Sequence, residues 1–160
     1  MITALQPLSP KQFLQHDPRR ILVSGVNWLG DAVMTTPALL RLRERFPDAH
    51  ITLLTPAKLA DLWRSCRSLD AIINFSPTQS PWSVARQLRT VHADTTLVFP
   101  NSPRAALEVW AACIPERIGY SRPWRNWFLT RAIEPRPGET RTFKRSVNEI
   151  KRLVRTSRRA

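Results

Sequence analysis

Short apolar runs alternate with amphipathic segments along most of the chain. Five runs have the length and composition of strands, and they cover residues 21–26, 50–55, 71–75, 95–99 and 117–120. Apolar residues recur at helical spacing in the segments 37–46, 57–66, 82–92 and 102–113, and again in the basic segment 142–155. Strands and helices that alternate at these lengths predict a parallel sheet covered on both faces.

The helical segments have apolar faces that are expected to pack against this sheet. The expected inward residues are Leu39, Leu42, Phe46; Leu59, Leu62, Trp63, Cys66; Trp82, Ala85, Leu88, Val91; Ala106, Val109, Trp110, Cys113; and Val147, Ile150, Val154. Thr36 and Pro37 suit the N-cap and first position of a helix. If residues 30–35 are already helical, Pro37 should kink that helix. Residues 121–135 show no clear pattern.

Right-handed crossovers between parallel strands predict a Rossmann-like doubly wound α/β fold. In such a fold the ligand crevice lies beyond the carboxyl ends of the strands, where the strand order reverses. With the common order 3-2-1-4-5, the loop 25–31 (GVNWLGD) and the loop 100–104 (PNSPR) should meet there. Two segments about seventy residues apart would thus form one site.

The first of these loops does not match a known phosphate-binding motif. Gly25 and Gly30 have four residues between them, but Asp31 and Ala32 stand where a phosphate-binding loop has lysine and serine or threonine. A dinucleotide site would need a third glycine at a different spacing. The pattern therefore favours neither a nucleoside triphosphate nor NAD or FAD.

Asp31 has two interpretations at the start of the expected helix. The positive end of the helix dipole stabilises an acid in the first turn by about 0.3–1 kcal/mol, so the residue could be structural. A carboxylate at the mouth of the crevice could also act as a general base and take a proton from a substrate hydroxyl. The residue pattern alone leaves both interpretations open.

Two further groups of polar residues are candidates for binding. Asn101, Ser102 and Arg104 could hydrogen-bond a sugar or pair with an anion, although helix capping by Asn101 or Ser102 explains them equally well. In the segment SRPWRNW, Arg122 and Arg125 alternate with tryptophans as a platform for sugar or phosphate would. The second of these tryptophans, at position 127, is instead expected in the core.

Composition limits the class of protein further. The chain has 160 residues, the size of one domain, and a formal net charge of +13. This charge indicates an anionic partner or a solvated basic surface. The cysteines at 66 and 113 are expected to be reduced and buried, and no metal-binding motif is present in the sequence. Without a membrane-spanning run or a convincing signal peptide, a cytoplasmic location is expected.

Several motifs together resemble a known family. The segments ILVSGVNWLGDAVMTTPALLRLRERFPDAHITLLTP, LVFPNSPRAALEVW and IPERIGYSR are similar, in this order, to the N-terminal half of the lipopolysaccharide heptosyltransferases, glycosyltransferase family 9, and most of all to the heptosyltransferase II branch. The resemblance covers roughly residues 19–155. Residues 1–18 are then a loose leader, 19–155 a Rossmann-like acceptor-binding domain and 156–160 a basic tail.

The resemblance implies an inverting glycosyltransferase of the GT-B type that needs no metal or other cofactor. The donor, ADP-heptose, would bind a C-terminal domain that this chain lacks and that could act in trans. The acceptor would be the inner core on lipid A, which implies peripheral attachment to the cytoplasmic face of the inner membrane. Asp31 maps to the family's catalytic base. Acceptor-binding candidates are Asn27, Trp28, Gly30, Asn101, Ser102, Arg104, Arg122 and Arg125.

On this resemblance the chain alone should be inactive, and no specific nucleic acid is expected as a partner. The alternative function is a non-catalytic basic module that binds anionic lipid or nucleic acid. Such a module would need its cations gathered on one face, whereas here they are spread along the chain with one dense tail.

Overall fold

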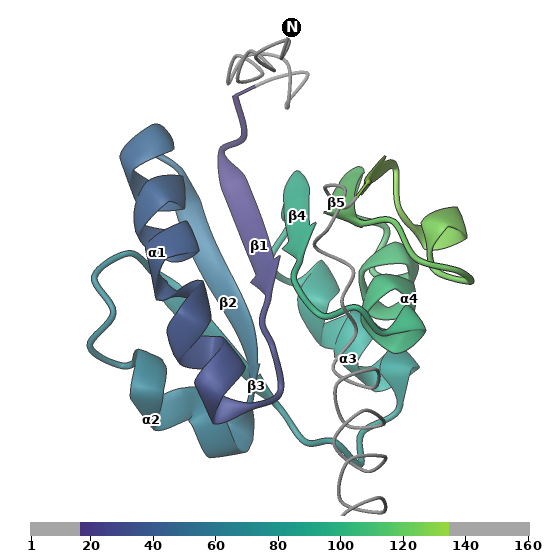
Figure 1. The fold of residues 1–160 in the computed structure, drawn as a ribbon, viewed down its shortest axis with the longest axis horizontal. Coiled ribbons are helices and arrows are strands. Elements are labelled where there is room, and N and C mark those ends of the chain that lie inside the picture. Colours follow the sequence, from purple (N-terminus) through teal and green to yellow (C-terminus); the bar gives the residue numbers. More distant parts are fainter. Residues whose placement is uncertain (1–16, 135–160) are drawn as a thin grey trace, which may run out of the picture.

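A computed structural model describes residues 17–134 of the chain. Six parallel strands form one sheet in the order β3-β2-β1-β4-β5-β6 (Figure 1). The strands are β1 (Arg20–Ser24), β2 (His50–Pro56), β3 (Ala71–Phe75), β4 (Thr95–Val98), β5 (Glu116–Tyr120) and β6 (Arg131–Ile133). The five expected strands, their order and the doubly wound fold are confirmed. The sixth strand lies within residues 121–135, where the sequence pattern predicted no element.

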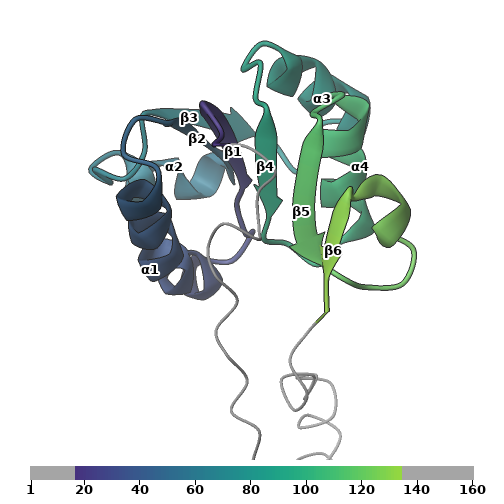
Figure 2. The ribbon, with the colours of Figure 1, turned by 90° about the horizontal axis from the view of Figure 1, so that it is seen from above.

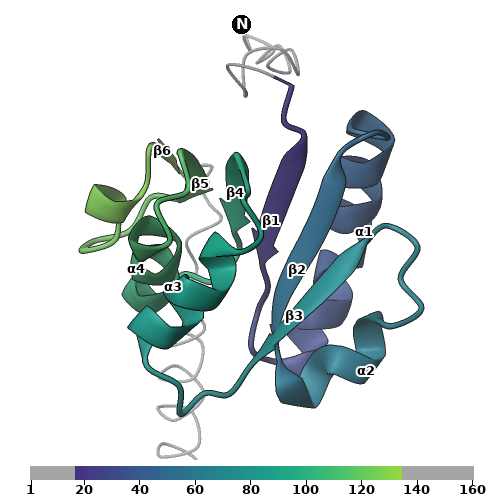
Figure 3. The same cartoon turned by 180° about the vertical axis from the view of Figure 1, so that it is seen from behind.

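Helices cover the sheet on both faces. The helices are α1 (Leu29–Arg45), α2 (Ala60–Trp63) after a short 3-10 turn (Ala57–Leu59), α3 (Pro81–Arg89) and α4 (Pro103–Ala111), and a second 3-10 turn (Asn126–Phe128) precedes β6. Figure 2 shows α1 and α2 on one face of the sheet and α3 and α4 on the other, and Figure 3 shows the same layers from behind. The expected helix at 142–155 lies outside the described residues, as do most of the leader and the whole basic tail.

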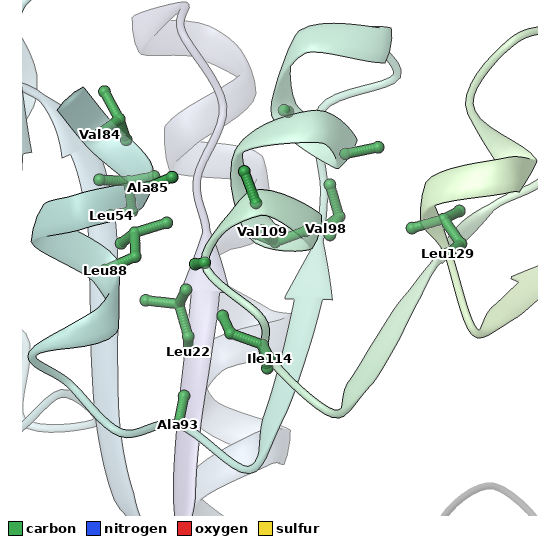
Figure 4. Packing of buried hydrophobic residues seen from close by; sticks show 14 residues of the cluster. Leu22, Leu54, Val84, Ala85, Leu88, Ala93, Val98, Val109, Ile114 and Leu129 are labelled. Atoms are coloured by element: carbon green, nitrogen blue, oxygen red, sulfur yellow. The ribbon is translucent and has the colours of Figure 1, made fainter. Parts of the chain in front are cut away.

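The core consists of two apolar clusters, one on each face of the sheet. On one face Leu22, Leu54 and Val98 of the strands pack against Leu88 and Val109 of α3 and α4 (Figure 4). On the other face Ile21, Val23, Ile51 and Leu53 pack with Leu39, Leu59 and Trp63. Successive residues of β1 therefore point to opposite faces, as the pleat of a strand requires. The continuous apolar run in β1 follows from this burial on both faces.

The first helix differs from the expectation. α1 begins at Leu29 and continues through Pro37, with Trp28 as its N-cap residue, so the predicted N-cap at Thr36 is wrong. Three of the expected contacts are confirmed, because Leu39 is buried and Leu42 and Phe46 pack against the same cluster. Because α1 begins at Leu29, the carboxylate of Asp31 lies in the first turn of a helix.

Some expected core residues are exposed. Leu62, Trp82, Trp110 and Trp127 all have large exposed fractions, and Trp127 is 87% exposed. The helices that carry the first three are shorter than expected, at four to nine residues, so only part of each apolar face meets the sheet. Cys113 is exposed and Cys66 half-buried, and both are free thiols. The expected burial of Cys113 is therefore wrong, because the chain turns there with a positive φ of 61° after the end of α4.

Candidate functional site

The crevice at the carboxyl ends of the strands brings the two predicted loops together. β1 pairs with β4 in register, with Ser24 opposite Val98. The loops that follow these two strands line one small cavity, to which the first contributes Gly25 and Asn27 and the second Ser102 and Arg104. The predicted convergence of the two loops is observed for Gly25 and Asn27, whereas Asp31 lines a separate hollow that contains none of residues 101–104.

Gly25 fixes the exit of β1 into this site. Its backbone N–H donates to the carbonyl of Leu54 across 2.8 Å. A Cβ atom at position 25 would lie 2.8 Å from the same carbonyl oxygen, so the close approach of β2 requires glycine. Gly30 is different, since a Cβ atom there would meet nothing within 4 Å. The space around Gly30 therefore does not require glycine.

Asp31 lines a hollow in the described part of the molecule. This hollow has a volume of about 450 Å³ and lies between α1 and the strands β4, β5 and β6. Asp31, Thr35 and Tyr120 are the residues that bring polar side-chain groups to its wall, which is otherwise mostly apolar. Asp31 is exposed and lies near the N-terminus of α1. The helix dipole favours the charged carboxylate there.

Asn27, Trp28 and Arg104 lie together around a second hollow of about 290 Å³. Lys58 completes this wall and lies 5.4 Å from the centre of the Trp28 ring, a cation–π distance. Lys58 was not among the site residues predicted from the sequence. The rule that ligands bind beyond the carboxyl ends of strands could have found it, because it follows β2 directly. Trp28 is 72% exposed and offers its ring to solvent.

Arg104 is held by several partners at once. Its Nε donates to the Glu108 carboxylate over 2.8 Å, and its two terminal nitrogens donate to the carbonyls of Pro77 and Gln79. Glu108 is buried, and this burial raises the pKa of its carboxyl, while the bond from Arg104 opposes the rise. Arg104 therefore braces the loop between β3 and α3 against α4. Arg104 also lines the hollow that Trp28 and Lys58 border.

The second loop has both a capping residue and a positioned amide. Ser102 is the N-cap of α4, because its Oγ accepts from the backbone N–H of Ala105 over 3.3 Å. Asn101 is exposed, and its Oδ1 accepts from Nη1 of Arg125 over 3.2 Å. Of the two residues that the sequence offered as caps, Ser102 has that role.

Arg125 lies in a different place from the one that the sequence suggested. The residue is fully buried, so its guanidinium has no surface to offer to a ligand. Burial lowers its pKa, the charge of Arg122 lowers it further, and Nε and Nη2 have no hydrogen-bond partner. Arg125 therefore holds Asn101 from the protein interior, and its side chain does not face the crevice. Arg122 is half-buried, and its backbone N–H donates to the side chain of Asn126. Trp124 and Trp127 are both exposed. The two arginines therefore do not form a common platform with these tryptophans.

None of the helices between residues 17 and 134 is both long enough and apolar enough to cross a bilayer. Within the same range, no three histidine, cysteine, aspartate or glutamate side chains gather as ligands for a metal ion would.

Known proteins with similar sequences are heptosyltransferases. No family model matches the chain. Lipopolysaccharide heptosyltransferase 2 of Salmonella typhimurium is 29% identical over 119 residues, which are 71% of this chain and 34% of that protein. The Escherichia coli protein of the same name is 28% identical over 116 residues, 69% of this chain and 33% of that protein. The chain thus spans about a third of the length of the curated relatives it matches.

Solved structures agree with this result. The E. coli ADP-heptose lipopolysaccharide heptosyltransferase II superposes with a TM-score of 0.63 at 30% identity, over 69% of this chain and 33% of that chain. A glycosyl transferase family 9 protein from Veillonella parvula has a TM-score of 0.68 at 24% identity, over 76% of this chain and 37% of that chain, and this likeness concerns the fold alone. By sequence and by fold, the chain is similar to the lipopolysaccharide heptosyltransferases over about a third of their length.

Proposed function

We propose that this chain is the acceptor-binding half of an inverting GT-B glycosyltransferase. In this proposal the intact transferase moves heptose from ADP-heptose to the inner core of lipopolysaccharide. The observation that carries the proposal is the position of Asp31, a carboxylate in the first turn of α1 at the wall of an open hollow between α1 and the strands β4, β5 and β6. Similarity to heptosyltransferase II supports the choice of sugar and acceptor.

Asp31 is the general base of the proposed reaction. An acceptor hydroxyl oxygen attacks the anomeric carbon of the donor, and a new C–O bond forms there as the bond to the diphosphate breaks. ADP leaves with the electron pair of that bond, and the proton of the acceptor hydroxyl passes to the Asp31 carboxylate. Attack from the side opposite the leaving group inverts the anomeric centre. Such a base contributes roughly 10²–10⁴-fold in rate.

The second hollow supplies groups that suit the anionic part of the acceptor. Lys58 and Arg104 are the cations on its wall, and Asn27 adds hydrogen-bonding groups. The exposed Trp28 ring can stack on a sugar, and the amide N–H₂ of Asn101 can donate to an acceptor oxygen. Ser102 and Gly30 shape the two loops. Arg122 remains a candidate for an anionic group, whereas Arg125 acts through Asn101.

The donor and the membrane complete the proposed assembly. ADP-heptose binds a donor domain that corresponds to the rest of the relatives' length, either in the same polypeptide or in trans, so residues 1–160 alone turn over no donor. The acceptor is a lipid in the inner leaflet, and the transferase attaches peripherally to the cytoplasmic face. The exposed apolar side chains of Trp28, Leu29, Val33 and Met34 beside the site support contact with a lipid-linked acceptor.

A binding experiment on the chain itself tests this function. Titration with a phosphorylated lipopolysaccharide core oligosaccharide, followed by ¹⁵N NMR, should shift the amides of Asp31, Trp28 and Lys58 and leave those of α3 unchanged. Duplex DNA is the control ligand. Equal or tighter binding of DNA, with a steep decrease of affinity as salt rises, would instead support the alternative, a basic module for nucleic acid.

A further inference from the structure

Several aromatic side chains are exposed on α4 and on the segment between β5 and β6. Trp110 near the end of α4 is 44% exposed, and Trp124 and Trp127 in that segment are 83% and 87% exposed. The rings of Trp110 and Phe128 meet edge to face with their centres 5.6 Å apart, so the 3-10 turn before β6 lies against α4 (Figure 2). We call Trp110, Trp124, Trp127 and Phe128 the aromatic patch. Exposed aromatic rings gathered in this way indicate a binding surface.

Three arginines border the aromatic patch. Nη2 of Arg89 in α3 donates to the carbonyl of Ala111 over 2.7 Å, directly after the tryptophan of α4. Nε of Arg117 in β5 donates to the carbonyl of Phe128 over 2.7 Å. Arg122 belongs to the same segment as the two most exposed tryptophans. The first of these arginines is exposed and the other two are half-buried, so positive charge accompanies the exposed rings.

No acidic side chain within residues 76–133 is exposed. The acids of this range are Asp94, Glu108 and Glu116, and all of them are buried or half-buried. Each of these carboxylates accepts a hydrogen bond from another group of the protein. The side of α1 and α2 differs, because it carries the exposed acids Asp31, Glu44, Asp48 and Asp61. The exposed charges on α3, α4 and the segment between β5 and β6 are therefore all positive.

This combination of groups suits the surface of an anionic bilayer. An indole ring has an apolar body and one N–H donor, and it is typical of the level between lipid headgroups and acyl chains. A guanidinium binds phosphate through two parallel hydrogen bonds. Each cation near an anionic membrane strengthens binding about fivefold, and the net charge of +13 attracts the chain before contact. A second copy of this chain fits less well, because symmetric pairing of the patch would place arginine opposite arginine.

We propose, independently of the transferase function, that the aromatic patch together with Arg89, Arg117 and Arg122 binds the headgroup region of an anionic bilayer. The indole rings of Trp124 and Trp127 enter this region, and the guanidinium groups pair with lipid phosphates. None of the patch residues or these arginines lines the hollows of about 450 and 290 Å³ at the candidate site. Attachment through the patch therefore uses no residue that borders those hollows.

Binding of the full chain to large unilamellar vesicles tests the proposal. The vesicles contain either phosphatidylcholine alone or an equal mixture with phosphatidylglycerol, and sedimentation measures the bound fraction. A double variant, Trp124→Ala with Trp127→Ala, removes the two most exposed rings, and Leu40→Ala at a 51% exposed position of α1 is the matched control. We expect the double variant to bind the anionic vesicles about tenfold more weakly or less tightly still, because binding scales with the apolar area that enters the membrane. Leu40→Ala should bind within about twofold of the unsubstituted chain.

Two single charges, one on each side of the molecule, are compared in the same assay. Arg122→Gln removes a charge beside the patch, and Arg41→Gln removes one that is exposed on α1. We expect Arg122→Gln to weaken binding to the anionic vesicles about fivefold and Arg41→Gln to weaken it less than about twofold. Thermal unfolding with unchanged midpoints confirms that the variants are folded.

Equal vesicle affinities of the double tryptophan variant and Leu40→Ala would overturn the proposal, and so would equal affinities of the two arginine variants. An affinity of the unsubstituted chain for the anionic vesicles no greater than for phosphatidylcholine alone would also contradict it. A dimer in light scattering that the double variant abolishes, without a change in vesicle binding, would show that a second copy covers the patch instead. The titration with the core oligosaccharide tests the transferase function separately from all of these results.

Discussion

Arg125 donates a hydrogen bond from Nη1 to Oδ1 of Asn101 over 3.2 Å, and so joins the segment between β5 and β6 to the loop that opens α4. The guanidinium is fully buried, and Nη2 lies 2.7 Å from the place where a Cβ atom of residue 119 would be. Gly119 therefore leaves the space that Arg125 occupies. Arg125 thus holds the exposed Asn101 through the oxygen of its amide.

Gly119→Ala should destabilise the chain by about 1–3 kcal/mol, because the new methyl group overlaps the buried guanidinium. Arg125→Met should lower the free energy of unfolding much less, or leave it unchanged. Two nitrogens of Arg125 are buried without hydrogen-bond partners, and a flexible apolar side chain removes the free-energy cost of burying them. In the double variant the cost of Gly119→Ala should shrink. Urea unfolding of the four proteins measures this coupling, and a strictly additive cycle would contradict the contact.

The two glycines of the first loop should respond in opposite directions. Gly25→Ala should cost about 1–3 kcal/mol, because its Cβ would press on the carbonyl oxygen of Leu54. Gly30→Ala should stabilise the chain by up to about 1 kcal/mol, since alanine favours a helix and the site has space. Thermal unfolding of each variant measures both effects. Equal losses from the two substitutions would show that both glycines are required by the loop.

The effects of substituting Arg104 and Glu108 on stability should depend on each other, because the Glu108 carboxylate is buried. Arg104→Ala leaves a buried carboxylate without its cation, at a cost of about 1–3 kcal/mol, because the Arg104 side chain is 40% exposed and water partly screens the pair. Glu108→Gln in the same chain should recover most of this loss, because the neutral amide needs no counter-ion. Burial already raises the pKa of Glu108, so the folded state binds its proton more tightly than the unfolded state does. The penalty of Arg104→Ala should therefore shrink as pH falls toward the raised pKa, and a penalty independent of pH would contradict this explanation.

Asp70 should make the free energy of unfolding of the chain depend on pH in the acid range. Burial alone would raise the pKa of its carboxyl, but the backbone N–H of Ile51 and the Arg43 guanidinium outweigh burial and lower it below the ordinary value of 3.8. The stabilisation is then complete above that ordinary value and is lost as pH falls through the lowered pKa. Asp70→Asn should therefore destabilise the chain at neutral pH and have little effect in strong acid. Asp48→Asn, at an exposed site, is the control for urea unfolding at both pH values.

Much of the fold was predictable from the sequence because strands buried on both faces are continuous apolar runs. The run at 21–23 and the segment TTLVF at 95–99 are examples, and their pairing followed from topology alone. β6 was not predictable in this way, because it has three residues, of which only Ala132 and Ile133 are apolar. The exposure of Trp110 and Trp127 was missed because a large apolar residue at helical spacing usually faces a core.

The candidate site was predictable in position more than in detail. Asp31 and the loop from Asn101 to Arg104 were identified from their places after β1 and β4. Sequence alone could not show that Arg125 is buried beneath Asn101, because that contact depends on how the segment after β5 folds back. The pairing of Arg104 with Glu108 did leave a signal, since opposite charges four residues apart on a helix are neighbours.

The most direct measurement of the central claim is the turnover of the intact transferase, this chain together with its donor domain, with Asp31→Asn. The substitution keeps the size of the side chain and removes the base. We expect the chain to fold with an unchanged unfolding midpoint, to bind the core oligosaccharide as before and to lose at least about 10²-fold in kcat. Turnover within about threefold of the unsubstituted enzyme, with the same folding and binding, would contradict the assignment of Asp31 as the general base.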